Sequence, residues 1–570
     1  MTALGALVAC SGGERDASPP ADAVNVILIS LDTVRRDALS TYGRRPRHAP
    51  GVATTPQLDA LAAEGVVMED AYTTTSWTLP SHLGLLSGQP ELVHAVEQSF
   101  HRYEATFPLL AEVFQEHGYR TAGFVSGPFL EPHFGFDRGF DRYETCYGDE
   151  LKRSSEHTAR MREARDAARE RGDAQGFVKA FEAHEAAKEV LAERGRTDRS
   201  STIVTDAALS ELERAAETGQ PFFLFAHYFD AHADYIPPAE HDRFDPDYAG
   251  RIDGSSVPDE GGPPGRVGGS GPPASWGTQR DLEHLVALYE GELRWTDAEV
   301  GRLLSRLDEL GLAETTLVVV TADHGEEFFE HGILGHRSTL FEEVTRVPLI
   351  LRLPGTLPAG ARVGGLVSTI DVPATVLELT RLPLPPSSSS ASFVGLIGGE
   401  DDGAERGVFG RLVLSASISM PAPPGARMER IPGHRISVIE TYREGQIKIT
   451  RKRSWPKVAL KVNPELDRRF AQETERMRSR EELTWIDVVA HPDERPEQHT
   501  SDFSDGRARA ALERFRARYV ELLAKREEGR VERADDELTT MLKSLGYTGD
   551  EGAEGEAFAL PPPGDQVLGR

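Results

Sequence analysis

Short runs of apolar residues, separated by amphipathic and polar stretches, recur along the first part of the chain. Most of them are apolar on both faces, which is the pattern of a central strand in a parallel sheet and not of a half-exposed strand. The runs that are apolar on both faces cover residues 24–30, 221–229, 315–321 and 347–353. A further strand is predicted at residues 120–126.

Between these runs the spacing changes to that of helices. Pro56 suits the first position of a helix over residues 55–62, and a glycine closes a helix predicted over 107–118. A long helix is predicted over 282–310. Strands that alternate with helices indicate an α/β fold with a doubly wound, mostly parallel sheet.

The chain has 570 residues, which is too many for one ordinary core at roughly 100–200 residues per domain. We expect a large α/β domain over residues 24–382, a linker with prolines and a serine run over 383–405, and a small α+β unit over 406–570. In the small unit, residues 436–451 and 484–489 predict strands and 507–526 a helix.

Two stretches of the large domain depart from this alternation. Residues from about 145 to 200 are rich in Ala, Glu and Arg and predict a charged helical insertion. Residues from about 250 to 277 are rich in Gly, Pro and Ser and predict a loop. Neither stretch contains a motif that identifies a substrate.

Composition and charge narrow the class of protein. Hydrophobic residues make up 39% and charged residues 27%, as in ordinary globular proteins. The 64 basic residues are outnumbered by 92 acidic ones, giving a net charge of −28, which disfavours binding to nucleic acid. An anionic small molecule is not excluded, because a metal ion can reverse the charge inside a pocket.

The first 23 residues predict a signal-like segment followed by a linker. Leu7 to Cys10, followed by Ser11, resembles a bacterial lipobox, although no Lys or Arg precedes the apolar run. On this resemblance we expect an extracytoplasmic protein, periplasmic or held at the membrane by an acyl group on Cys10. The alternative is an ordinary frayed N-terminus.

The candidate chemistry lies where the apolar strands end. The first run is followed by Asp32, the second by Asp230 and His232, and the third by Asp323 and His324. Ligands of open α/β sheets bind beyond the carboxyl ends of the strands. Carboxylate oxygen and imidazole nitrogen there suit a divalent cation, whereas a single Asp in such a place is often only a helix cap.

A further element begins near Thr78. Pro80 and Gly88 suit the start and the end of a helix, so Thr78 is expected just before the helix N-terminus. Free N–H groups at that end favour an anionic tetrahedral group. A bound metal would activate the Thr78 hydroxyl as a nucleophile; the alternative is that Thr78 only caps the helix.

In order and spacing, these motifs together resemble the sulfatase family of the alkaline phosphatase superfamily. The resemblance covers roughly residues 24–380 and extends weakly to 483–494 and 542–547. It implies a divalent metal ion and hydrolysis of a small, glycan-type or lipid-type anionic ester. The motifs are Asp32, residues 78–88, Asp230 to His232, Asp323 to Glu326, and Gly335 with His336.

The sequence also departs from the pattern of that family. Thr78 stands where sulfatases carry the Cys that is converted to formylglycine, and a threonine cannot be converted in that way. His82 replaces an arginine and Thr33 the second of two aspartates. His324 replaces an amide residue and His336 a lysine. A threonine nucleophile with Asp and His ligands resembles the phosphodiesterase branch of the superfamily.

The resemblance therefore gives the following candidates. We expect Ca²⁺, Zn²⁺ or Mn²⁺ as the cofactor, with Asp230 serving as a ligand, as a partner of His232, or as a loop cap. The expected metal ligands are Asp32, Thr78, Asp323, His324 and Asp230, and the expected catalytic residues are Thr78, His82, His232 and His336.

The favoured function is hydrolysis of phosphate or sulfate esters through Thr78. Three alternatives stay open: a true sulfuric ester hydrolase, a transferase that passes a phospho-group to an alcohol, and a non-catalytic binding protein on the same scaffold. The last is disfavoured because a site that has lost activity does not need Asp32, Thr78, Asp323 and His324.

Overall fold

The computed structural model describes most of the chain, and the gaps fall between well-defined elements. The described ranges are 22–98, 101–103, 107–148, 200–254, 276–399, 406–421, 430–458, 480–526 and 531–533. Residues 19, 20, 179, 183 and 272 are described as well.

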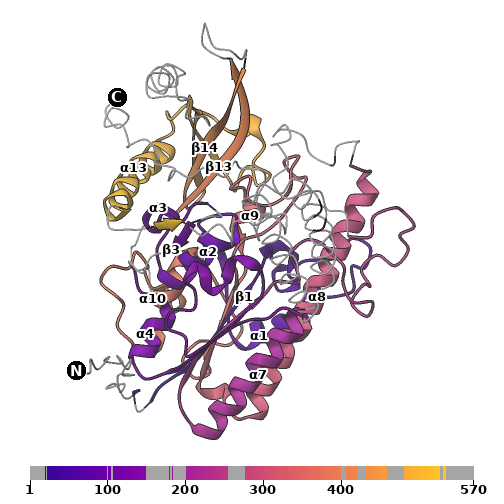
Figure 1. Ribbon diagram of the computed structural model, residues 1–570, viewed down its shortest axis with the longest axis vertical. Helices are drawn as coiled ribbons and strands as arrows, with labels where there is room; N and C mark the ends of the chain where they lie inside the picture. The colour runs from indigo at the N-terminus through magenta and orange to yellow at the C-terminus, as the bar shows by residue number, and fades with distance from the viewer. Residues whose placement is uncertain are drawn as a thin grey trace, which may run out of the picture.

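A nine-stranded sheet forms the centre of the larger part (Figure 1). Its order is β10-β2-β11-β7-β1-β6-β4-β5, with β12 beside β2. Every residue of β1, β6 and β7 is buried, because these apolar runs lie in the middle of the sheet. The strands are β1 (Asn25–Leu31), β2 (Val66–Tyr72), β4 (Arg120–Val125), β5 (Arg142–Thr145), β6 (Phe222–Tyr228), β7 (Thr316–Ala322), β10 (Arg346–Val347), β11 (Leu349–Arg352) and β12 (Ala361–Ser368).

Helices cover both faces of this sheet, which confirms the doubly wound α/β fold. Helices α1, α7 and α8 pack together on one face, and α2, α4 and α10 lie on the other (Figure 1). Their bounds, with those of the short helices, are α1 (Pro56–Glu64), α2 (Thr78–Ser87), α3 (Glu91–His94), α4 (Leu110–Glu116), α7 (Ser200–Thr218), α8 (Gln279–Glu309), α9 (Glu342–Thr345), α10 (Val372–Leu379) and α11 (Val394–Ile397).

Local signals set the ends of several helices, and those at Pro56 and Gly88 confirm the sequence prediction. Pro56 is the first residue of α1, and Thr278 caps α8 by accepting a hydrogen bond from the backbone of Asp281. Helix α2 ends at Gly88, whose φ of 69° favours glycine. A Cβ there would lie 2.7 Å from Ser388 Oγ, so glycine also permits close packing. The start of α2 differs from expectation, because the helix begins at Thr78 itself and Pro80 is its third residue.

The sheet differs from the sequence prediction in the direction of β11, which lies between β2 and β7. The run at residues 347–353 forms β11, which pairs antiparallel with both β7 and β2. An apolar run shows that a strand is buried but carries no sign of its direction. Strand β2 and helix α7 were not predicted.

The C-terminal unit is an antiparallel sheet in the order β13-β14-β15-β16, against which α13 packs (Figure 1). The single strand predicted over residues 436–451 is two strands, joined at Gly445 with a φ of 53°. The other two elements predicted there are present. The bounds are β13 (Gly407–Pro421), β14 (Arg430–Glu444), β15 (Ile447–Val458), β16 (Arg480–Asp487) and α13 (Gly506–Arg526).

Two small pairings complete the described structure. Strands β8 and β9 form a hairpin close to the end of β7, and β3 pairs with β17 near the end of the described chain. Their bounds are β3 (His101–Tyr103), β8 (Glu327–Phe328), β9 (Leu334–Gly335) and β17 (Val531–Arg533).

Several sequence predictions fall outside this description. Cys10 and residues 542–547 are not described, and neither is most of the predicted insertion (about 145–200) or of the predicted loop (about 250–277). Among the described residues, no helix combines the length and the apolar character needed to cross a membrane.

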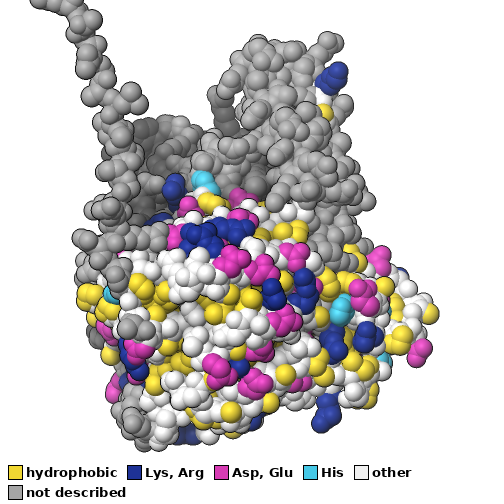
Figure 2. Space-filling model, turned by 90° about the horizontal axis from the view of Figure 1, so that it is seen from below, with side chains coloured by type: hydrophobic (Ala, Val, Ile, Leu, Met, Phe, Trp, Pro, Cys, Tyr) yellow, Lys and Arg dark blue, Asp and Glu magenta, His cyan; other side chains and the backbone are white. Residues whose placement is uncertain are grey.

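Charged side chains of both signs lie on the face of the molecule that Figure 2 shows from below. Seen from below, acidic and basic side chains are mixed over the part of that surface that is described (Figure 2). The net charge of −28 therefore does not form one acidic patch on this face.

Candidate metal and nucleophile site

The carboxyl ends of β1 and β7 bring two aspartates together. These strands are parallel neighbours, with Leu31 opposite Ala322, so Asp32 and Asp323 leave the sheet side by side. His324 follows on the same turn. Ligand atoms of Asp32, Asp323 and His324 all lie within 4.8 Å of one another, and all three residues are buried.

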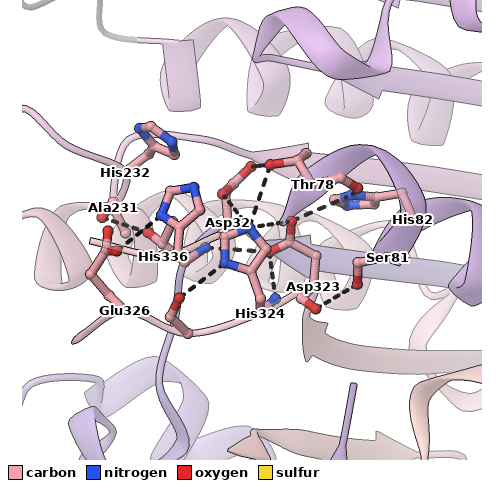
Figure 3. A network of polar contacts seen from close by, with 12 residues as sticks. Asp32, Thr78, Ser81, His82, Ala231, His232, Asp323, His324, Glu326 and His336 are labelled. Atoms are coloured by element: carbon pink, nitrogen blue, oxygen red, sulfur yellow. Dashed lines mark hydrogen bonds and ion pairs between the residues drawn. The ribbon is translucent and has the colours of Figure 1, made fainter. Parts of the chain in front are cut away.

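Thr78 joins this group from α2. Its Oγ1 lies 3.4 Å from Asp32 Oδ2 and 3.5 Å from His324 Nε2 (Figure 3). His324 Nε2 also lies 3.3 Å from Asp323 Oδ2. The structure thus brings together four of the predicted site residues, from three separate elements, around one point.

The charges at this point fit a cation. Burial, and then the charge of Asp32, raise the pKa of Asp323 to about 7. Asp323 Oδ2 is buried and accepts no hydrogen bond among the described residues. Two adjacent carboxylates in a buried place are costly without a compensating positive charge, and a divalent ion would supply it.

His324 has the form that a metal ligand needs. Burial, and then the neighbouring His336, lower the pKa of His324 to about 4, so its imidazole is neutral near pH 7. Its Nδ1 lies 3.0 Å from the carbonyl oxygen of Gly325. A proton on Nδ1 leaves the Nε2 lone pair facing the carboxylates, which is how metal-binding histidines are usually oriented.

His227 is a site residue that the sequence reading missed. It is the residue before the last of β6, and its Nε2 donates to Asp32 Oδ2 at 3.1 Å. Burial lowers the pKa of His227 to about 4. A polar residue near the carboxyl end of a fully buried strand was the signal that could have identified it.

We expect His227→Leu to weaken binding of the metal by roughly 10–100-fold, the usual cost of losing a residue that orients a ligand. His227→Gln keeps a donor near Asp32 and should lose much less. Competition with a chelator of known affinity measures both. Equal affinity in wild type and His227→Leu would show that Asp32 needs no such support.

His82 lies on the inner side of the site. Its Nδ1 donates to the carbonyl oxygen of Thr78 at 2.9 Å, and its Nε2 lies 2.9 Å from Ser30 Oγ. The side chain is fully buried, and burial lowers its pKa to about 3. The structure thus places His82 beneath the turn that carries Thr78 and 3.5 Å from Asp323 Oδ2, and a catalytic role for it stays a prediction.

Asp230 does not join the cluster of carboxylates. It accepts hydrogen bonds from the backbone of Ser200 and Ser201, at 3.2 and 2.7 Å, and from Trp295 Nε1 at 3.2 Å. These contacts cap the start of α7, which was the structural alternative for this residue. We therefore do not include Asp230 among the proposed metal ligands.

His232 and His336 lie on the side of the cluster opposite His82 (Figure 3). Their ring centroids are 5.1 Å apart, and the ring of His336 lies 4.4 Å from that of His324. His336 Nδ1 lies 2.9 Å from Glu326 Oε1. Two imidazoles therefore border the point at which Thr78, Asp32 and His324 meet.

Thr33 replaces the second aspartate with a different contact. Its backbone has a φ of 56°, an uncommon conformation for a residue other than glycine. Its hydroxyl donates to the carbonyl oxygen of Ala231 at 2.9 Å, and its N–H donates to Asp323 Oδ1 at 3.3 Å. Thr33 thus ties the turn after β1 to the turns after β6 and β7.

This chain is similar to known proteins in both sequence and fold. The sequence pattern of the family described as Sulfatase matches residues 24–382. Iduronate 2-sulfatase of Homo sapiens is 26% identical over 409 residues, which cover 66% of this chain and 69% of that protein. Its counterpart in Mus musculus is 25% identical over 438 residues, covering 65% and 71%.

Solved structures share the fold at lower identity. A phosphonate monoester hydrolase from Silicibacter pomeroyi is 20% identical, with a TM-score of 0.57 and coverage of 90% of this chain and 100% of that one. A phosphonate monoester hydrolase of Agrobacterium radiobacter is 18% identical, with a TM-score of 0.56 and coverage of 88% and 96%. A structure in complex with its substrate D-glucosamine-2-N,6-O-disulfate is 16% identical, with a TM-score of 0.57 and coverage of 89% and 98%.

Proposed function

Because this chain belongs to the sulfatase family of ester hydrolases, we propose that it hydrolyses phosphate esters through a covalent intermediate on Thr78. The observation that carries the proposal is the place of the Thr78 hydroxyl, 3.4 Å from Asp32 and 3.5 Å from His324 at the first residue of α2. A helix N-terminus favours the anionic group that Thr78 would attack.

Asp32, Asp323 and His324 would hold the divalent cation, with Thr78 Oγ1 beside it. Oxygen ligands suit Ca²⁺, whereas an imidazole ligand suits Zn²⁺ or Mn²⁺ better. When bound, the ion would favour the ionised form of the threonine hydroxyl and polarise an oxygen of the substrate.

The first step is in-line attack of Thr78 Oγ1 on phosphorus. Thr78 Oγ1 gives up its proton and bonds to phosphorus, the bond from phosphorus to the alcohol oxygen breaks, and that oxygen takes up a proton, so the step has no net change in protons. Water then attacks phosphorus and loses one proton, while Thr78 Oγ1 takes up one as the threonine ester breaks, which restores the hydroxyl. His232 and His336 border the site and are suited to stabilise the non-bridging oxygens or to supply the proton.

The choice of phosphorus over sulfur rests on Thr78. A formylglycine hydrate releases sulfate by elimination from its second hydroxyl, so water need not attack a sulfated enzyme. A threonine ester lacks that route and must be cleaved by activated water. Phosphate monoesters also carry up to two negative charges where sulfate monoesters carry one, so a site with a cation and two histidines gains more from phosphate.

The similar structures suggest a general class of natural substrate. One structure of this fold is in complex with a disulfated glucosamine and another with k-i-k-neocarrahexaose, and both molecules are sugars. A glycan-type anionic ester is therefore a reasonable natural substrate for this chain. The shared fold does not choose between sulfur and phosphorus, since both chemistries occur among the similar structures.

A matched panel of aryl esters tests the proposal. The aryl sulfate, phosphate, phosphodiester and phosphonate monoester of one phenol are assayed with Ca²⁺, Mn²⁺ or Zn²⁺ added in turn. We expect kcat/KM for at least one phosphorus ester to exceed that for the sulfate. A clear preference for the sulfate over every phosphorus ester would return this protein to the true sulfatases.

A further inference from the structure

The segment that leads into α2 is held on all sides. Residues 73–76 are at most 1% exposed. The N–H of Thr73 donates to the carbonyl oxygen of Thr345 at 2.8 Å, and the carbonyl oxygen of Ser76 accepts from the N–H of Arg337 at 2.9 Å. The hydroxyl of Thr74 donates to Glu91 Oε1 at 2.8 Å. The position of Thr78 therefore depends on what surrounds this segment.

One of these surroundings is the C-terminal sheet. Its strand β13 packs on α3 and on the segment that leads into α2 (Figure 1). The N–H of Arg411 donates to the carbonyl oxygen of Thr74 at 2.8 Å. A Cβ on Gly410 would lie only 3.2 Å from that same oxygen. The pattern shared with the family ends at residue 382, so this contact comes from outside the matched region.

The side chain of Arg411 fixes β13 in this place. It is 1% exposed, and its Nε donates to Glu97 Oε1 at 2.8 Å. Its Nη1 bonds to Glu440 of β14, which also accepts from Arg451 Nε at 2.7 Å. Glu97 belongs to the loop after α3, so Arg411 joins the C-terminal sheet to the domain that carries the site.

Guanidinium groups surround the two carboxylates of this junction, Glu97 and Glu440. Although burial opposes it, the guanidinium groups of Arg411 and Arg526 lower the pKa of Glu97 to about 2. Burying ion pairs is costly, and such pairs often contribute little net stability. Their directional hydrogen bonds do fix one arrangement of the two surfaces.

We infer that Arg411 is a positioning residue for Thr78: it locks β13 against the carbonyl oxygen of Thr74 and so sets where α2 begins. This inference rests on the proposed function, because it gives Thr78 the role of nucleophile. It also makes the C-terminal sheet a part of the catalytic unit and not an appendage.

The first test replaces Arg411 by glutamine. If the entry to α2 relaxes, kcat should fall by about 10²-fold with little change in KM, as expected when a reacting group is displaced by about 1 Å. The matched control is Arg514→Gln, which removes the ion pair between α13 and Glu444 at the end of β14 in the same unit. Both are assayed well below their melting temperatures.

The second test does not remove a buried charge. Gly410→Ala places a methyl group against the carbonyl oxygen of Thr74 and the hydroxyl of Thr441. We expect kcat to fall by about tenfold, since the displacement should be a fraction of 1 Å. The control is Gly407→Ala, at another glycine of β13. Its methyl group would crowd Tyr442 of β14, away from Thr74, so kcat should stay near that of wild type. If Arg411→Gln does not fold, the comparison of Gly410→Ala with Gly407→Ala still tests the inference.

A measurement independent of turnover separates this inference from the proposed function. Hydrogen exchange followed by mass spectrometry should show faster exchange at residues 73–78 and 411 in Arg411→Gln and Gly410→Ala, but not in the controls. Faster exchange with no effect on kcat would remove the catalytic role. Unchanged exchange, or equal losses of kcat in variants and controls, would overturn the inference. An inactive wild type would instead count against the proposed function.

Discussion

Replacing Thr78 by alanine is expected to lower kcat by roughly four to six orders of magnitude, as for loss of a covalent nucleophile in other hydrolases. The reason is geometric: Thr78 Oγ1 is the hydroxyl that lies between Asp32 and His324, at 3.4 and 3.5 Å. Turnover of the best aryl ester measures the effect. Circular dichroism should be unchanged, because the alanine fits the first position of α2.

Thr78→Ser is the matched control for this loss. It keeps a hydroxyl at the same place and should retain far more activity than the alanine variant. Stopping the wild-type reaction in acid should leave the phosphoryl group on the peptide that contains residue 78, visible by mass spectrometry. Near-native activity in Thr78→Ala would favour direct attack by water on the substrate.

Replacing Asp323 by alanine is expected to abolish stoichiometric metal binding and, with it, activity. Asp323 contributes one of the two carboxylates that converge with His324. Loss of a direct ligand should cost more than the roughly 10–100-fold that an orienting residue costs. Elemental analysis of the purified protein gives the metal content. The melting temperature adds a second readout: a chelator should lower it in wild type but leave the variant unchanged.

Asp230→Ala serves as the control for this experiment. It removes the cap of α7, at a cost of about 1 kcal/mol in the free energy of unfolding, but leaves the three converging ligands in place. We expect a lower melting temperature with full metal content. Equal metal content in wild type and Asp323→Ala would show that the ion is not bound where we propose.

The proximity of Asp32 and Asp323 could be predicted because it follows from the order of the strands. Adjacent parallel strands end at one edge, and the pairing of Leu31 with Ala322 places Asp32 beside Asp323. The position of Thr78 could also be predicted, because Pro80 and Gly88 mark the start and the end of a helix in the sequence. Each of these signals is local and needs only the assumption of a parallel sheet.

The rest depends on contacts between distant parts of the chain. Arg411 and Glu97 are 314 positions apart, and no local pattern relates them. The role of Asp230 as a cap is invisible until Ser200 is placed beside it. His227 was read as one more residue of a buried strand, because the apolar run hides a single imidazole.

The anchoring of α7 bears on how the chain tolerates change. Ser200, the first residue of α7, is held by Asp230. Cys146 is held by its N–H, which donates to the carbonyl oxygen of Val125 at 2.7 Å. Both contacts lie outside the group formed by Asp32, Asp323 and His324. A substitution that loosens either contact should therefore lower the stability of the fold before it disturbs the proposed metal site.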